Sequence, residues 1–335
     1  MDSLSPERDP WSASRFVPGA AAGHYESWFQ RANHPSRPLA FWIRYTIFCP
    51  LGRPADAVGE LWAIAFDGET SRIAAVKQEL PIAQCGFSSR GLDVRIGEAQ
   101  LSGRALAGAA TARGHRLAWQ LAYAGGETPL LLLPRASYAR GFPRAKAVVT
   151  APNAVFDGWL EIDGARLAIE GWRGSQNHNW GSRHTDRYAW GQVAGFDGAP
   201  DVFLECSTAR VRLGPLWTPW LTLVALRVEG RELALNSLLR AARARARIDG
   251  FTWTFDTRAG DVRLRAHIEA PASAFVGLRY ANPPGGAKIC LNTKLASCEL
   301  VLEEAGRPTR SFRTAHRAAF EILGDEPAPG VPVVA

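Results

Sequence analysis

Short segments in which apolar and polar side chains alternate recur along most of this chain, and they favour β-strands. In FWIRYTIF (residues 41–48), Phe41, Ile43, Tyr45 and Ile47 alternate with mixed side chains, so one face of the strand is apolar. Several segments end at Asp-Gly or Gly-Gly pairs, which are typical of hairpin turns. Strands at this regular spacing predict an antiparallel barrel or sandwich. Further segments of this kind cover residues 60–70, 92–97, 115–126, 155–174, 189–196, 201–213, 220–230, 231–239, 251–257, 262–270 and 298–304.

The strands form two series of similar length, separated by a proline-bearing passage at residues 141–154. We therefore expect an all-β chain with two barrel-like halves and few helices, the helical segments being residues 238–244 and 316–323. The expected division has four parts: a flexible arm at 1–20, an N-terminal barrel at 21–154, a C-terminal barrel at 155–323, and a disordered tail at 324–335.

The composition is that of a globular protein, with 47% hydrophobic and 21% charged residues. The net charge of +7 permits only a weak attraction to anionic partners. The densest basic run, residues 240–248, is interpreted as a solvated strand face, with a phosphate or anionic-lipid contact as the alternative. Because no nucleic-acid motif and no run of about 20 apolar residues is present, we expect no nucleic-acid partner and at most peripheral membrane contact.

Five cysteines without a C-x-x-C pair, and a start without an apolar signal region, favour reduced thiols in the cytoplasm. Phosphate loops, dinucleotide fingerprints and G-x-S-x-G elbows are missing, so no cofactor is expected. His178, His184 and Asp186 are close in sequence, but they lack the paired spacing of zinc ligands, and we expect no metal. The oligomeric state stays open.

Polar and aromatic residues are concentrated in GSQNHNWGSRHTDRYAW (residues 174–190). In an extended conformation His178 and Trp180 share one face, while Asn177 and Asn179 share the other. An imidazole beside an indole can line an apolar cavity that needs one group able to handle a proton. The alternative is structural: Asn and Gly form a turn, and the tryptophan closes a barrel end.

The following residues, SRHTDRYAWGQ, place Asp186, Tyr188 and Trp190 on one strand face. Asp186 has two interpretations. It orients an imidazole, or it forms a surface salt bridge with Arg183 or Arg187, which is the favoured interpretation.

Two glutamates lie within apolar strands. Glu205, in DVFLECSTARV, has apolar neighbours on both sides, and in a barrel interior burial would raise its pKa. A carboxyl group that stays protonated near neutral pH can act as a general acid. A carboxylate at the barrel rim or a buried pair with arginine are the alternatives. Glu26 shares a strand face with Trp28 and is a candidate binding residue.

Together, YESWF, FPRAK, NHNWG and YANPPGGAKICLNTKLASCELVL make the chain resemble the tocopherol cyclase-like and carotenoid 1,2-hydratase-like proteins, over residues 23–304. The resemblance implies two lipocalin-like barrels with an apolar ligand cavity. It also implies hydration, ring closure or cycloaddition of long isoprenoid or polyketide-like molecules. The motif's histidine and tryptophan correspond to His178 and Trp180, its leading aspartate is replaced by Asn177, and its downstream acidic residue, usually aspartate, corresponds to Glu205.

The expected function is therefore cofactor-independent acid–base catalysis on a hydrophobic substrate. In this hypothesis His178 and Glu205 handle the proton. Trp28, Trp180 and Trp190 line the cavity and stabilise a carbocation, while Asn177, Asn179 and Tyr188 orient the reacting groups. The alternative is a lipocalin-like carrier without chemistry, and a third possibility is a structural or partner-binding β-protein.

Overall fold

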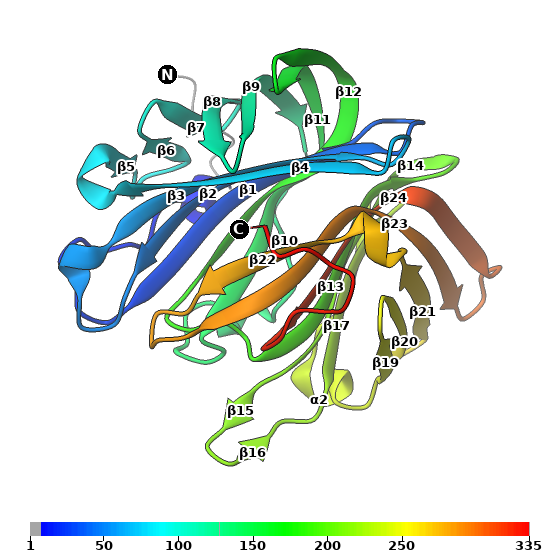
Figure 1. The fold of residues 1–335 in the computed structure, drawn as a ribbon. Helices are drawn as coiled ribbons and strands as arrows, with labels where there is room; N and C mark the ends of the chain where they lie inside the picture. Colours follow the sequence, from blue (N-terminus) through cyan, green and yellow to red (C-terminus); the bar gives the residue numbers. More distant parts are fainter. Residues whose placement is uncertain (1–7, 127, 335) are drawn as a thin grey trace.

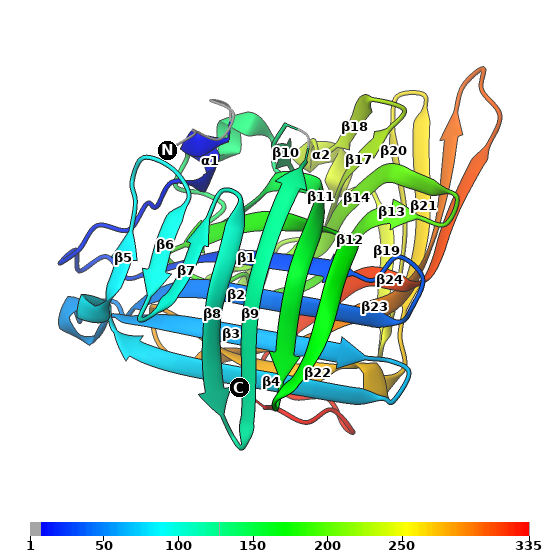
Figure 2. The same ribbon diagram turned by 90° about the horizontal axis from the view of Figure 1, so that it is seen from above.

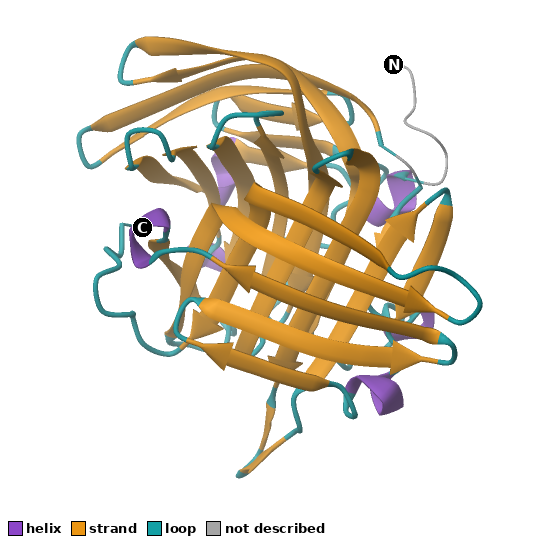
Figure 3. Cartoon of the chain, turned by 90° about the vertical axis from the view of Figure 1, so that its right-hand side faces the viewer, coloured by secondary structure: helices purple, strands orange, loops and turns teal. Residues whose placement is uncertain are grey.

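The computed structural model describes residues 8–126 and 128–334, and strands account for most of them (Figure 3). The expected all-β class is confirmed. Within the described ranges the α-helices are two single turns, α1 (Asp9–Ser12) and α2 (Leu238–Ala241), the second within the helical segment expected at 238–244. The other expected helix, 316–323, is instead part of strand β24 (Arg310–Gly324), because hydrogen bonding to strands on both sides overrides its local helical pattern.

The first sheet forms a nearly closed antiparallel barrel, called here the N-terminal barrel. Its strand order is β4-β3-β2-β1-β12-β11-β9-β8-β7-β6-β5, with β10 paired to β11. In Figure 2 the strands β8, β9, β11 and β12 cross over β2–β4 and so close the barrel. The strands are β1 (His24–Asn33), β2 (Leu39–Cys49), β3 (Val58–Asp67), β4 (Arg72–Pro81), β5 (Cys85–Phe87), β6 (Asp93–Ile96), β7 (Ala99–Ser102), β8 (Ala105–Ala112), β9 (His115–Gly125), β10 (Leu130–Leu131), β11 (Ala145–Ile162) and β12 (Ala165–Gly181).

The second sheet, called here the C-terminal sheet, has the order β18-β17-β14-β13-β24-β23-β21-β20-β19, with β22 paired to β23. It lies below the N-terminal barrel in Figure 1, where the hairpin β15–β16 projects from it. Its strands and that hairpin are β13 (Arg187–Phe196), β14 (Ala199–Arg210), β15 (Arg212–Leu213), β16 (Leu216–Trp217), β17 (Leu221–Val228), β18 (Arg231–Leu235), β19 (Arg245–Asp249), β20 (Thr252–Ala259), β21 (Val262–Glu269), β22 (Val276–Ala281), β23 (Ala287–Glu304) and β24.

The division between the two sheets falls between Gly181 and Arg187, not at residue 154. The expected boundary lies inside β11, which pairs with β12 along most of its length. The proline at position 152 does not end this strand, because register shifts near Ala151 and Ala154 absorb it. As a result NHNWG belongs to the N-terminal barrel rather than to the C-terminal half.

Parts of both chain ends, expected as a flexible arm and a disordered tail, are packed against the fold. The Ser14 amide donates to the Ser88 carbonyl at 2.8 Å, and the Trp28 indole donates to the Ser12 carbonyl at 2.7 Å. At the other end Val331 is buried, and the Val334 amide donates to the Gly277 carbonyl at 2.9 Å. The parts of these predictions that concern residues 1–7 and 335 lie outside the described residues.

Each sheet encloses an apolar core of its own. Trp28, Trp119 and Trp172 fill the N-terminal barrel, and Trp253 and Phe320 lie in the core of the C-terminal sheet. A third apolar cluster joins the outer face of the barrel to the second sheet, through Phe29, Trp42, Trp62, Leu278 and Tyr280 among others. Because side chains alternate along β1, Trp28 points into the barrel and Phe29 points out of it toward the second sheet.

All five cysteines are described and all are free thiols. Across residues 8–126 and 128–334, no helix has the length and apolar character needed to cross a membrane.

Candidate active site

A cavity of about 200 Å³ lies between the N-terminal barrel and the C-terminal sheet, lined mainly by apolar side chains. Strands β1, β2, β11 and β12 supply one wall, and β13, β14, β17, β22 and β24 supply the other. This location differs from the expected barrel interior, because the interior of the N-terminal barrel is already filled by its own aromatic core. We call this space the intersheet cavity.

Glu205 on β14 lines the intersheet cavity and is only 3% exposed. Its carboxyl oxygens accept hydrogen bonds from the Trp190 indole at 2.7 Å and from the Gln192 amide at 2.8 Å. Burial raises the pKa of Glu205 to about 7, against the opposing effects of these two hydrogen bonds and of the Arg31 charge. Near neutral pH a large share of Glu205 is therefore a protonated acid in an apolar wall.

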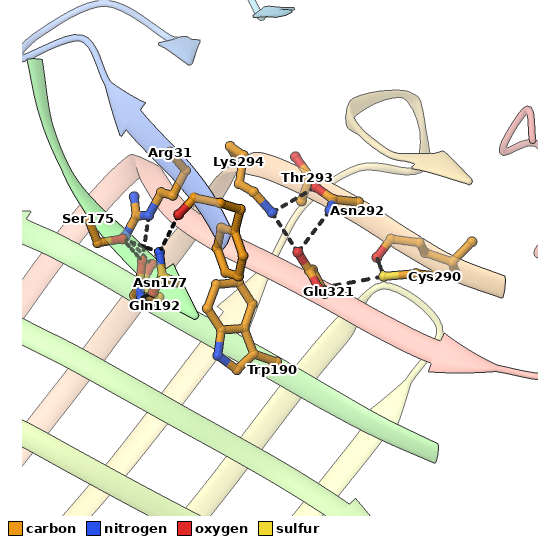
Figure 4. A network of polar contacts seen from close by, with 12 residues as sticks. Arg31, Ser175, Asn177, Trp190, Gln192, Cys290, Asn292, Thr293, Lys294 and Glu321 are labelled. Atoms are coloured by element: carbon orange, nitrogen blue, oxygen red, sulfur yellow. Dashed lines mark hydrogen bonds and ion pairs between the residues drawn. The ribbon is translucent and has the colours of Figure 1, made fainter. Parts of the chain in front are cut away.

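A buried polar network around Gln192 fixes the orientation of its side-chain amide (Figure 4). The Gln192 side-chain oxygen accepts from Ser175 at 2.6 Å and from Arg31 at 2.7 Å. Its nitrogen donates to Asn177 at 2.8 Å as well as to Glu205. With the oxygen held by two donors, the nitrogen must face Glu205, so the network positions the carboxyl group.

A second carboxyl group in the cavity wall, Glu321 on β24, has a different environment. It pairs with the fully buried Lys294 at 2.9 Å and accepts from Asn292 at 2.8 Å. In Figure 4 the Trp190 ring lies between this group and the Gln192 network. Among the described residues, Glu205 accepts hydrogen bonds only from the neutral Trp190 and Gln192, whereas Glu321 is bound to a cation. Glu205 is therefore the better candidate for a proton donor.

His178 does not line the intersheet cavity, so the structure separates it from Glu205. The alternation along β12 turns Asn177 and Asn179 to the cavity, while His178 and Trp180 face the other side of the strand. The expectation that His178 and Trp180 share a face was right, but the cavity lies on the opposite face. The imidazole is fully buried and stacks on Trp28, with ring centroids 4.8 Å apart.

His178 instead binds Glu26 and the N-terminal arm. Its Nε2 lies 2.8 Å from Glu26 Oε1, and its Nδ1 lies 2.6 Å from the Trp11 carbonyl oxygen. Both ring nitrogens of His178 therefore face acceptors. Nδ1 donates one proton to the Trp11 carbonyl, and a second proton is shared between Nε2 and Glu26. Glu26 also accepts from the Arg15 amide at 2.9 Å and the Ser14 hydroxyl at 3.0 Å. Burial raises the pKa of Glu26, but hydrogen bonds from His178 and His24 outweigh it and lower the value to about 2.

The remaining candidate site residues also divide into those that line the cavity and those that do not. Asn177, Asn179, Tyr188 and Trp190 line the cavity with Glu205, whereas Glu26, Trp28 and Trp180 do not. Asp186 lies just before β13 and pairs with Arg183 at 2.7 Å, as the favoured interpretation expected, but it is buried rather than at the surface. It also accepts from the Arg212 amide at 2.8 Å, so its role is to hold a loop.

The model of the family described as tocopherol cyclase-like matches residues 142–324, more than half of the chain. The chain belongs to the tocopherol cyclase-like family. The matched segment includes NHNWG, Glu205 and the whole C-terminal sheet, and thus most of the candidate site.

Relatives of this tocopherol cyclase-like chain include an uncharacterized protein of Mycobacterium tuberculosis, Rv0493c, which is 28% identical over 306 residues, or 88% of this chain and 86% of that protein. Among solved structures, a Nitrosomonas europaea protein assigned to AttH superposes with a TM-score of 0.59 at 12% identity, covering 95% of this chain and 98% of that one. CghA, also crystallised with Sch210972, superposes with a TM-score of 0.53 at 13% identity, covering 95% of each chain. These likenesses show the lipocalin-like fold.

Gln192 and Arg31 are parts of the candidate site that the sequence did not reveal. Gln192 lies directly opposite Glu205 in the pairing of β13 with β14. Knowledge of this strand register could have identified Gln192, because cross-strand neighbours on one face contact each other. Arg31 is 161 residues from Gln192 in sequence, and no local pattern joins the two.

Proposed function

We propose that this chain is a cofactor-independent hydratase or cyclase that protonates a double bond of a hydrophobic, isoprenoid-like or polyketide-like substrate in the intersheet cavity. The proposal rests on one observation: a buried carboxyl group, with its pKa raised to about 7, faces a largely apolar cavity. Membership of the tocopherol cyclase-like family supports the reaction class.

In the proposed step, protonated Glu205 transfers its proton to one carbon of the double bond, and the other carbon becomes a carbocation. The faces of Trp190 and Phe29, both in the cavity lining, stabilise the cation. Capture by water gives an alcohol, and the proton released by that water returns to Glu205. Capture by a nucleophilic group of the same molecule closes a ring, and the proton lost on closure returns in the same way. Asn179 and Tyr188 orient the substrate through hydrogen bonds.

A carrier function is the second candidate, and the position of His178 favours it. Catalysis was expected to use two proton-handling groups in one cavity, and the cavity contains Glu205 but not His178. The same apolar lining would bind a ligand without changing it.

Mass spectrometry of small molecules extracted from the purified protein distinguishes the two functions. For an enzyme, Glu205→Gln is expected to retain a compound that differs from the wild-type compound by one water, or an isomer with one ring fewer. Glu170→Gln is a matched control, because Glu170 is exposed on β12, and it should retain the wild-type compound. The same compound in all three proteins would refute catalysis by Glu205 and favour the carrier.

A further inference from the structure

Arg44 on β2 is a buried cation in the cavity wall that has no polar partner in the described part of the chain. Its side chain lines the intersheet cavity, and the residue is only 6% exposed. Among the described residues it has no hydrogen bond or ion pair, and its buried Nε has no acceptor. A buried charge without a hydrogen-bonding partner is costly, so its presence in a cavity wall needs an explanation, and a ligand that completes its hydrogen bonds provides one.

The surroundings of Arg44 do not neutralise it. Its guanidinium lies over the Tyr280 ring, 4.5 Å from the centroid, which supplies no acceptor oxygen in hydrogen-bonding geometry. The two acidic groups close enough to affect its charge are already paired, Glu60 with Lys77 at 2.9 Å and Glu321 with Lys294 at 2.9 Å. Burial lowers the pKa of Arg44, but Tyr280, Glu60 and Glu321 raise it overall, so the side chain stays charged.

We propose that Arg44 binds a carboxylate of the substrate, so that the substrate is a hydrophobic carboxylic acid. This inference rests on the proposed function and adds the substrate class. A planar carboxylate accepts two parallel hydrogen bonds from a guanidinium and carries the single charge that one arginine balances. Of the other two cations in the lining, Lys146 donates to the Pro143 carbonyl. Arg210 stacks over Trp217 and Trp220, and its Nε, like that of Arg44, has no acceptor among the described residues, so Arg210 is the alternative position for the carboxylate.

The position of Arg44 also orients the substrate relative to Glu205. Arg44 lies opposite Phe29 in the pairing of β2 with β1, and Phe29 contacts the Trp190 ring edge-on, with centroids 6.1 Å apart. Trp190 in turn donates to Glu205. An acid held at Arg44 would lay its apolar chain along Phe29 and Trp190 toward Glu205. Because facing sheets pack about 10 Å apart, the reacting double bond lies several carbon atoms from the carboxyl group.

Isothermal titration calorimetry with decanoic acid and methyl decanoate tests this inference at neutral pH. The two probes share the apolar chain and differ in charge. The wild-type protein is expected to bind the acid roughly 10- to 100-fold more tightly than the ester, as a charge-assisted hydrogen-bonded pair provides. Arg44→Gln should abolish this preference while ester binding persists. Arg210→Gln, the same substitution at another arginine of the lining, should preserve the preference.

Equal binding of acid and ester by the wild-type protein overturns the inference, and this result does not depend on the folding of any variant. A preference that survives Arg44→Gln but is lost in Arg210→Gln also overturns it, by placing the acid at Arg210. If the preference depends on Arg44 but Glu205→Gln leaves the extracted compound unchanged, the inference stands and the chain is a carrier of acids. If acid and ester bind equally while Glu205→Gln changes that compound, the proposed function stands without this substrate class.

Discussion

Replacement of His178 by alanine is expected to lower the free energy of unfolding by about 4 kcal/mol. The substitution leaves a void between Trp28 and Trp180, whose rings both contact the imidazole at centroid distances of 4.8 Å. It also removes a buried hydrogen-bonding partner of Glu26, and leaving one member of a buried charged pair without the other is strongly destabilising. Urea unfolding followed by tryptophan fluorescence measures the loss.

His267→Ala provides the matched control, because His267 also faces a glutamate, Glu269 at 3.2 Å, but on the exposed surface. A surface pair of this kind contributes less than about 1 kcal/mol. Limited proteolysis gives a second measurement: since His178 and Glu26 bind the backbone of Trp11 and Arg15, the arm should be cleaved faster in His178→Ala. A loss no larger than that of His267→Ala would refute the structural role. A normally stable His178→Ala that retains an altered compound, as Glu205→Gln is expected to do, would restore His178 to catalysis.

The second large effect is a loss of stability as the pH rises, caused by Glu205. Its folded-state pKa of about 7 lies above the ordinary value of 4.5, so the folded protein holds the proton more tightly than the unfolded chain does. The resulting stabilisation is complete below about pH 4.5 and is lost as the pH rises through 7. The difference between the folded-state pKa of about 7 and the ordinary value of 4.5 corresponds to about 3 kcal/mol of stability.

Comparing wild-type protein with Glu205→Gln isolates this effect, because the other titrating groups are shared. The unfolding free energy of the wild type minus that of the variant should fall by about 3 kcal/mol between pH 4 and pH 8. If this difference in unfolding free energy stays constant between pH 4 and pH 8, Glu205 has the same pKa in the folded and unfolded chains. In that case Glu205 would be ionised near neutral pH, and its proposed role as a proton donor would fail.

The sequence by itself predicted many of the strands, the family and the burial of Glu205. These are local properties: alternation along a strand sorts side chains into two faces, and a carboxyl group within an apolar strand signals burial wherever that strand packs. Glu205 and the shared face of His178 and Trp180 were found in this way. The polar residues Asn177 and Asn179 were likewise assigned to a common face.

Only the tertiary structure decided which face meets the cavity and where the two sheets divide. Alternation does not say what lies opposite either face, so the sequence could not show that Asn177 faces the cavity and His178 the filled barrel. The contacts that complete the site join distant segments: Glu26 is 152 residues from His178, and Arg31 is 161 residues from Gln192. Such contacts depend on strand register and sheet packing, and these are set by the folded chain as a whole rather than by any local stretch of it.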